Sequence, residues 1–289
     1  MSSGSTVLFD APGPVARRRN TILTLLATIA TLGVAYLVYA KFDEKGQWNS
    51  QLWRHFISAS TWTEFIIPGL TGTLTAAGLG AVFALIFGAA FGLARLSEHG
   101  WIRQPAGAVV DIFRAIPLLL LIFFMAYLSP TLFGRGDYTL LALVGGLTLY
   151  NGSVLAEVLR AGVTAVPRGQ SEAAYALGLR KAGVMWHVLL PQAVTAMMPA
   201  IVSQFVVLLK DTALGYIIGY QDLLSYGFQF LPANYFGTRV SSAIVIATIY
   251  IGLNMTLSAL ASWLDHRPFA PRERRTLAPR EQRLAPASE

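Results

Sequence analysis

Six long runs without a charged residue constrain this chain more than any other feature of its sequence. A helix needs about 20 predominantly apolar residues to cross the hydrocarbon core of a bilayer, and each run approaches or exceeds that length. The runs occupy residues 21–40, 65–94, 115–134, 138–156, 182–209 and 240–264. The sequence therefore predicts an all-α polytopic membrane protein with six transmembrane helices.

Composition agrees with a membrane location and excludes several kinds of chemistry. Charged residues make up 13% of the 289 residues, whereas soluble domains carry about 25%. The chain has no cysteine and only four scattered histidines, so we expect no disulfide, metal site or bound cofactor. No lysine follows a glycine, which excludes the phosphate-binding loop of an ATPase. The net charge of +7 lies mostly beside the apolar runs, so we expect no nucleic-acid binding.

The distribution of Lys and Arg predicts how the chain is oriented in a plasma membrane. If the N-terminus is cytoplasmic, 16 basic residues lie in the inner segments and 5 in the outer segments. Basic loops are retained in the cytoplasm. We therefore expect both termini and the segment 165–191 to face the cytoplasm.

These patterns predict five parts of the chain: a cytoplasmic tail, a peripheral transmembrane helix, an external segment, a transmembrane domain and a second cytoplasmic tail, over residues 1–20, 21–40, 41–64, 65–265 and 266–289. The first apolar run exceeds the roughly 7 to 15 residues of a signal-peptide core, which favours an uncleaved anchor over a signal peptide. The Trp-rich external segment fits an interfacial helix or a contact with an external protein. The Arg-, Pro- and Ala-rich C-terminal tail is expected to be disordered and to bind anionic lipid.

The segment 165–191 carries a specific spacing of residue types. It reads Glu172-Ala173-Ala174, three residues, Gly178, nine residues, then Val188-Leu189-Leu190-Pro191. This pattern resembles the EAA loop of permease subunits of ATP-binding-cassette (ABC) importers, with Val188 in place of the usual Ile. Helix-forming residues after Glu172 predict a short helix, capped by Ser171 or Gln170 and ended by a turn at Gly178.

The resemblance covers roughly residues 68–264 and is closest to permeases for polar amino acids. Its further motifs are Gly69-Leu70-x2-Thr73-Leu74, Phe113-Arg114-x2-Pro117-Leu118-Leu119, Ala156-Glu157-x2-Arg160-Ala161-Gly162, Pro167-x-Gly169-Gln170 and Leu208-Leu209-Lys210-Asp211-Thr212. Arg114-Ala115-Ile116-Pro117 departs from the common Arg-Gly-Thr-Pro, and Leu121 replaces a Gln. That form and the additional N-terminal helix are most similar to permeases of glutamate-uptake systems.

The resemblance implies a non-catalytic permease with one peripheral helix and the five-helix core of a type I ABC importer. Its implied partners are cytoplasmic ATPases that bind ATP and Mg, a second permease subunit, an external solute-binding protein, membrane lipid and an amino acid substrate, with glutamate expected. The implied ATPase-coupling residues lie in the EAA loop: Glu172, Ala173, Ala174, Gly178, Leu179, Arg180 and Pro191.

Charged residues within or beside the apolar runs are candidates for the substrate pathway, because ionisable groups at membrane depth normally face a bundle interior or a polar cavity. Lys210 and Asp211 interrupt the fifth run. We expect Asp211 or Thr212 to cap a second helical piece, which leaves Lys210 to meet an anion; a role in packing alone is the alternative. Arg114 and the pair Glu157 and Arg160, one turn apart, are expected at a gate or interface.

Two other functional classes fit a polytopic chain. An ion-gradient-driven secondary transporter is often built from inverted halves with matching broken helices, but nothing in the first three runs mirrors the interruption at Lys210. A structural or assembly protein without a pathway is the other alternative.

Overall fold

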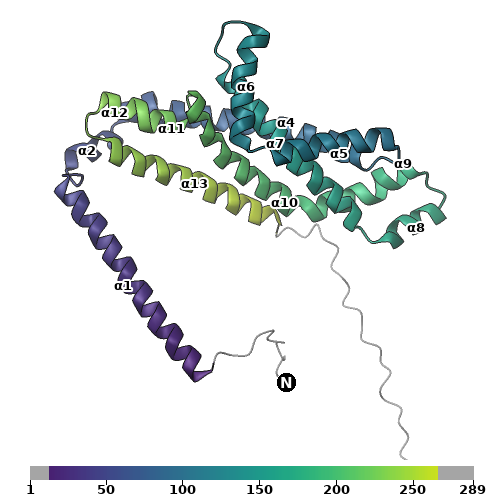
Figure 1. Ribbon diagram of the computed structural model, residues 1–289, viewed down its shortest axis with the longest axis horizontal. Helices are drawn as coiled ribbons and strands as arrows, with labels where there is room; N and C mark the ends of the chain where they lie inside the picture. Colours follow the sequence, from purple (N-terminus) through teal and green to yellow (C-terminus); the bar gives the residue numbers. More distant parts are fainter. Residues whose placement is uncertain (1–12, 266–289) are drawn as a thin grey trace, which may run out of the picture. The chain divides into compact units, whose positions relative to one another are not determined.

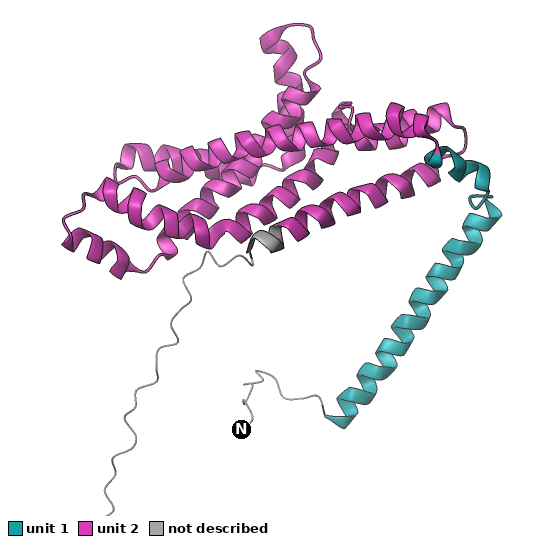
Figure 2. Ribbon diagram, turned by 180° about the vertical axis from the view of Figure 1, so that it is seen from behind, with its two compact units in different colours: residues 1–57 teal, residues 58–289 magenta. Residues whose placement is uncertain are grey.

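The structure is a computed structural model that describes residues 13–265. Within these residues all regular secondary structure is helical. The chain divides into two compact units, residues 1–57 and 58–289 (Figure 2). The structural predictions for residues 1–12 and 266–289 lie outside the described residues.

The first unit consists mainly of the long helix α1 (Pro14–Glu44), followed by α2 (Ser50–Arg54) and η1 (His55–Ile57). Helix α1 has 31 residues and extends beyond the predicted 21–40 at both ends. The hydroxyl groups of Thr28 and Thr31 donate to carbonyl groups four residues earlier, so these polar side chains are satisfied within the helix. The helix is long and apolar enough to cross a membrane.

The second unit contains all the remaining elements, and its long helices run alongside one another (Figure 1). The elements in chain order are α3 (Ala59–Thr61), η2 (Trp62–Ile66), α4 (Ile67–Arg95), α5 (Gly100–Ala115), α6 (Leu118–Phe133), α7 (Thr139–Ala165), α8 (Arg168–Ala176), α9 (Lys181–Val184), η3 (Met185–Leu189), α10 (Leu190–Asp211), η4 (Thr212–Ile218), α11 (Leu223–Ser225), η5 (Tyr226–Phe230), α12 (Leu231–Asn234) and α13 (Arg239–Asp265).

Small residues bring α4 and α7 into close contact. The buried residues of α4 are all Gly, Ala or Thr. A Cβ atom added to Gly88 would lie 2.7 Å from the Leu155 Cβ, and one added to Gly92 would lie 2.9 Å from a Leu159 methyl carbon. Because little hydrophobic force acts between helices in lipid, such close backbone approach provides the packing energy. Large aliphatic side chains of α7 and α10 fill the core beside this contact.

Five helical segments of the described chain are long and apolar enough to span a membrane, and a bent pair makes a sixth. This confirms the prediction of a polytopic all-α protein. The run 115–134 contains helix α6, which meets α5 at an angle of 102°. Ile116 has ψ 129°, which is the extended conformation favoured before a proline. Pro117 thus ends α5, and α6 projects from the bundle (Figure 1).

The second helical piece expected after Lys210 is the 3₁₀ helix η4, which follows α10 without a break, but Asp211 does not cap it. Asp211 has helical φ and ψ angles, and its side chain makes no cap hydrogen bond. Thr212 donates its hydroxyl hydrogen to the Leu209 carbonyl group instead. The chain therefore tightens from α10 into the 3₁₀ helix η4 and ends at Gly219, whose φ is +83°.

Candidate functional site

The EAA loop forms the short helix α8, which is mostly exposed. Pro167 precedes its first residue, and the Ser171 hydroxyl lies inside the helix, where it donates to the Arg168 carbonyl group. The expectation that Ser171 or Gln170 caps the helix was therefore wrong. Glu172 consequently lies in the middle of the helix rather than in its first turn. Ala173 follows it on the exposed surface.

Gly178 ends α8 as the sequence predicts. Its φ is +79°, a left-handed conformation that glycine adopts without steric cost. The Gly178 amide donates to the Tyr175 carbonyl group, and the Leu179 amide donates to the Ala174 carbonyl group. These two bonds form a Schellman motif, which satisfies the last carbonyl groups of the helix. Arg180 then begins the return towards α10, where Pro191 occupies the first turn.

The surface of α8 combines charge with exposed apolar side chains. Tyr175 is 47% exposed and Leu177 is 83% exposed, whereas Ala174 is buried against the protein. Lys181, just beyond the loop, forms an ion pair with Glu98 in the turn between α4 and α5. The loop is thus anchored to the bundle while it presents one face outward. Such an element fits the surface of a partner protein.

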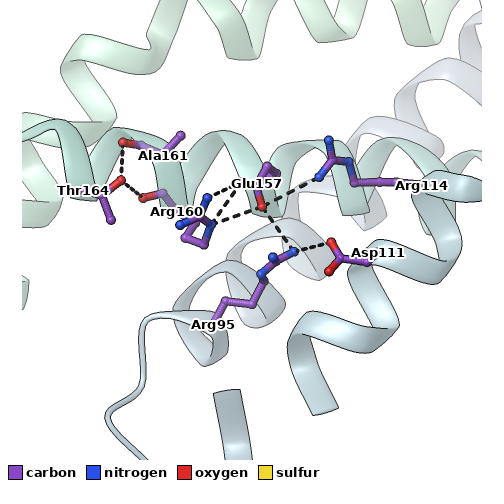
Figure 3. Close-up of polar contacts among 7 residues, drawn as sticks. All are labelled: Arg95, Asp111, Arg114, Glu157, Arg160, Ala161 and Thr164. Carbon is purple, nitrogen blue, oxygen red and sulfur yellow. Dashed lines mark hydrogen bonds and ion pairs between the residues drawn. The ribbon is translucent and has the colours of Figure 1, made fainter. Parts of the chain in front are cut away.

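Five charged residues from three helices form a cluster at the ends of α4 and α5, which we call the Glu157 cluster (Figure 3). Glu157 lies at its centre, 2.5 Å from Arg160, 3.2 Å from Arg95 and 3.8 Å from Arg114. Asp111 contacts Arg95 at 3.0 Å. Three cations and two carboxylates leave the cluster with one surplus positive charge.

The structure therefore brings together three predicted pathway residues, Arg114, Glu157 and Arg160. Sequence reasoning missed Arg95 and Asp111. Asp111 lies one turn before Arg114 on the same helix, and this spacing was the available signal. Arg95 ends α4, and only the packing of α4 against α5 and α7 places it beside the other charges.

Lys210 and Asp211 lie elsewhere. Leu208 packs beside Gly80, which is about 22 Å along α4 from Arg95 at 1.5 Å per residue. The Lys210 side chain lines a cavity of about 530 Å³ between α10 and α13, the Lys210 pocket, with Val206, Tyr250, Ile251, Asn254, Met255 and Ser258. Asp211 does not line this pocket, and no Lys210–Asp211 ion pair forms among the described residues. The Lys210 and Asp211 side chains therefore do not line the same pocket.

Buried polar groups connect α10 to its neighbours near this pocket. The Gln204 side-chain amide donates to the side-chain oxygen Oδ1 of Asn151 on α7 at 2.6 Å. The hydroxyl groups of Thr212 and Tyr250 lie 3.1 Å apart and tie η4 to α13. Over the described residues no group of three His, Cys, Asp or Glu side chains is arranged to hold a metal.

Comparison with known proteins identifies the family. Residues 84–269 match the family described as binding-protein-dependent transport system inner membrane component, and the chain belongs to this family. It is 42% identical over 234 residues to the glutamate transport system permease protein GluD of Corynebacterium glutamicum, covering 80% of this chain and 85% of that protein. It is 31% identical to the probable glutamine ABC transporter permease protein GlnP of Bacillus subtilis, over 70% and 93% of the two chains.

Solved structures agree with this assignment. A crystal structure of an amino acid ABC transporter matches with a TM-score of 0.65 and 31% identity, covering 73% of this chain and 98% of that chain. A chain of the MetNI methionine ABC transporter matches with a TM-score of 0.61 over 72% and 98%, and at 19% identity it supports the fold alone.

The protein is thus a multi-pass membrane permease of an ABC transporter, a non-catalytic subunit. ATP binding in such transporters belongs to a partner ATPase, and the family name implies a separate binding protein. The sequence has no phosphate-binding loop, which agrees with ATP binding by a separate subunit.

Proposed function

We propose that this chain forms the translocation pathway of an ATP-driven importer for polar amino acids, with glutamate as its substrate. The assignment of glutamate as the substrate rests on the 42% identity to a glutamate permease over 85% of that protein's length. Uptake of labelled glutamate by the importer reconstituted with its partners tests it. Competition by glutamate but not by basic amino acids is expected, and the opposite preference would refute the substrate.

We propose that α8 is the coupling helix that docks in a cleft of a cytoplasmic ATPase, which binds ATP and Mg. Its exposed Tyr175, with Glu172 on the same helix and Leu177 just after it, supports this role, because a short rigid helix with mixed chemistry can follow a partner's rigid-body motion. Glu172→Lys is expected to weaken ATPase association and to lower uptake. Glu64→Lys, the same charge change at an exposed position of η2, is the matched control. Normal uptake by Glu172→Lys would contradict the role.

We propose that Lys210 contacts an anionic group of the substrate. Its side chain lines a cavity between two candidate membrane spans, where an ammonium group is costly unless a cavity or a partner charge accommodates it. Lys210→Met is expected to lower apparent substrate affinity, whereas Lys210→Arg keeps the charge and part of the affinity. Unchanged affinity in Lys210→Met, measured while ATP hydrolysis is followed, would leave Lys210 with a packing role alone. Asp211 is proposed to line the same pathway from its other side.

We propose that the Glu157 cluster lies at the cytoplasmic gate and that the pathway is completed by a second permease subunit. Helix α7, which carries Glu157, continues through Val166 and Pro167 into α8, so a displacement of α8 reaches the cluster directly. Arg114 at the end of α5 and Arg160 on α7 would separate or close up as the cytoplasmic side opens and closes.

The proposed organisation of the remaining chain follows the charge distribution. Both termini are cytoplasmic, residues 21–40 lie within a peripheral membrane helix in contact with lipid, and residues 41–64 are external, on the side of the solute-binding protein. Residues 65–265 form the permease domain, with the coupling loop at 165–191. Labelling of single cysteines introduced into this cysteine-free chain tests the two sides.

A further inference from the structure

A second cavity lies at the start of α13, well separated from Lys210. It has a volume of about 460 Å³ and is lined by Tyr216, Phe228, Gln229, Pro232, Ala233 and Arg239. We call it the Arg239 pocket. Its lining combines one guanidinium group, one side-chain amide and one phenol with the apolar surfaces of Phe228 and Pro232. This composition is that of a small polar-ligand site: a few convergent polar groups on an apolar wall.

No described residue neutralises the charge of Arg239. Among the residues that the structure describes, its side chain forms no ion pair and no hydrogen bond, and it is exposed. Arg239 is also the first residue of the 27-residue helix α13, where the helix dipole is positive and a cation is unfavourable. An anion in the pocket would pair with the Arg239 charge and would also interact favourably with the positive end of the helix dipole.

The Arg239 pocket and the Lys210 pocket are both lined by residues of α13 and of the continuous segment formed by α10 and η4. Tyr250 lines the Lys210 pocket and follows Arg239 by eleven residues, which is about 16 Å along α13. On the facing segment, Tyr216 of η4 lines the Arg239 pocket and comes six residues after Lys210. The Thr212–Tyr250 contact at 3.1 Å holds the two segments together between the cavities. Because a five-carbon amino acid is much shorter than this separation, one molecule would occupy the two pockets in turn.

We propose that the Arg239 pocket is an outer subsite that binds a carboxylate of an acidic amino acid before the molecule reaches Lys210. Arg239 would hold the carboxylate through paired N–H···O bonds, and the Gln229 side chain supplies a neutral donor and acceptor for the rest of the ligand. The proposal rests on the proposed import of glutamate. It adds a second cation to the pathway and an order in which the two cations act.

The experiment uses the importer reconstituted with its ATPase, second permease and binding protein, at saturating glutamate-loaded binding protein. The measured quantity is glutamate imported per ATP hydrolysed. Arg239→Gln is expected to lower this ratio at least about tenfold, because it removes the charge-assisted pairing with the ligand carboxylate. Arg239→Lys keeps the charge but not the paired donors, and an intermediate ratio is expected. Arg135→Gln, at an exposed position in the loop before α7, is the matched control and should leave the ratio unchanged.

A chemical rescue separates charge from shape. The chain has no cysteine, so Arg239→Cys introduces a single thiol into this subunit. Modification with a cationic aminoethyl thiol reagent is expected to restore glutamate imported per ATP, and modification with an anionic sulfonatoethyl reagent is not. Equal results with the two reagents would overturn the subsite.

The carboxylate bound by Arg239 has one competing source, an acidic side chain of the binding protein. In that case Arg239→Gln would abolish stimulation of the ATPase by loaded binding protein, and this outcome would overturn the proposal. An unchanged import ratio in Arg239→Gln would overturn it as well. If the unsubstituted importer does not take up glutamate at all, the proposed substrate fails instead, so the two failures are distinguishable.

Discussion

The substitution Glu157→Gln tests whether the Glu157 cluster holds three helices together. Glu157 is the acid that contacts Arg95 of α4, Arg114 of α5 and Arg160 of its own helix (Figure 3). Glutamine keeps the size of the side chain but removes its charge. Asp111, which contacts Arg95, is then the remaining acid in the cluster, and α4 and α5 lose their ionic contact with α7.

The size of the effect follows from the exposure of these side chains. Removing one partner of a fully buried ion pair costs about 3–5 kcal/mol, whereas a fully exposed pair contributes about 0–1 kcal/mol. The Glu157 side chain is 23% exposed and that of Arg95 is 15% exposed, while Arg114 and Arg160 are 41% and 37% exposed. An intermediate cost of about 2 kcal/mol is therefore expected. For a domain of this size that corresponds to a fall in Tm of about 4–8 °C.

The assay is thermal unfolding of the purified protein, with Glu98→Gln as the matched control. Glu98 pairs with Lys181, but its side chain is 70% exposed, so its neutralisation should lower the free energy of unfolding by less than about 1 kcal/mol. A fall in Tm for Glu157→Gln no larger than that for Glu98→Gln would refute the reasoning.

Four further substitutions test other parts of the structure. Gly88→Ala places a Cβ atom 2.7 Å from a side-chain carbon of α7, and thermal unfolding should show a loss of about 1–3 kcal/mol. Gly178→Ala forces a side chain into φ +79° and should cost about 1 kcal/mol, whereas Gly169→Ala inside α8, with open space around it, should stabilise the helix. The Thr139 amide and hydroxyl group donate to Asp137 and lower the pKa of its carboxyl group. The stabilisation by these hydrogen bonds is therefore present above about pH 4 and is lost as the pH falls further. Asp137→Asn should reduce this part of the pH dependence of Tm.

The features that depend on local chemistry were predictable from the sequence. Run length alone indicated the spans, because a bilayer imposes a minimum length on any helix that crosses it. The end of α8 at Gly178 followed from the conformational freedom of glycine. In both cases the physical cause acts within a few residues of its effect.

The features that depend on tertiary packing were not predictable. The 102° bend before α6 occurs at a proline that the sequence displays, yet nothing local sets the direction that α6 takes. The helical conformation of Asp211 overrides its preference for a cap position, because Thr212 bonds back to α10 and contacts Tyr250. Arg95 joins the Glu157 cluster only because the small residues of α4 let α7 approach closely.

The central claim is that ATP hydrolysis by a partner, transmitted through α8, drives amino acid transport through this chain. The most direct measurement is uptake of labelled glutamate into proteoliposomes that contain the permease, its co-purified ATPase and the binding protein. The account predicts uptake that requires ATP on the ATPase side, persists without any ion gradient, and is lost when Glu172→Lys disrupts α8. Uptake that continues without ATP and collapses with the ion gradient would contradict it and identify a secondary transporter.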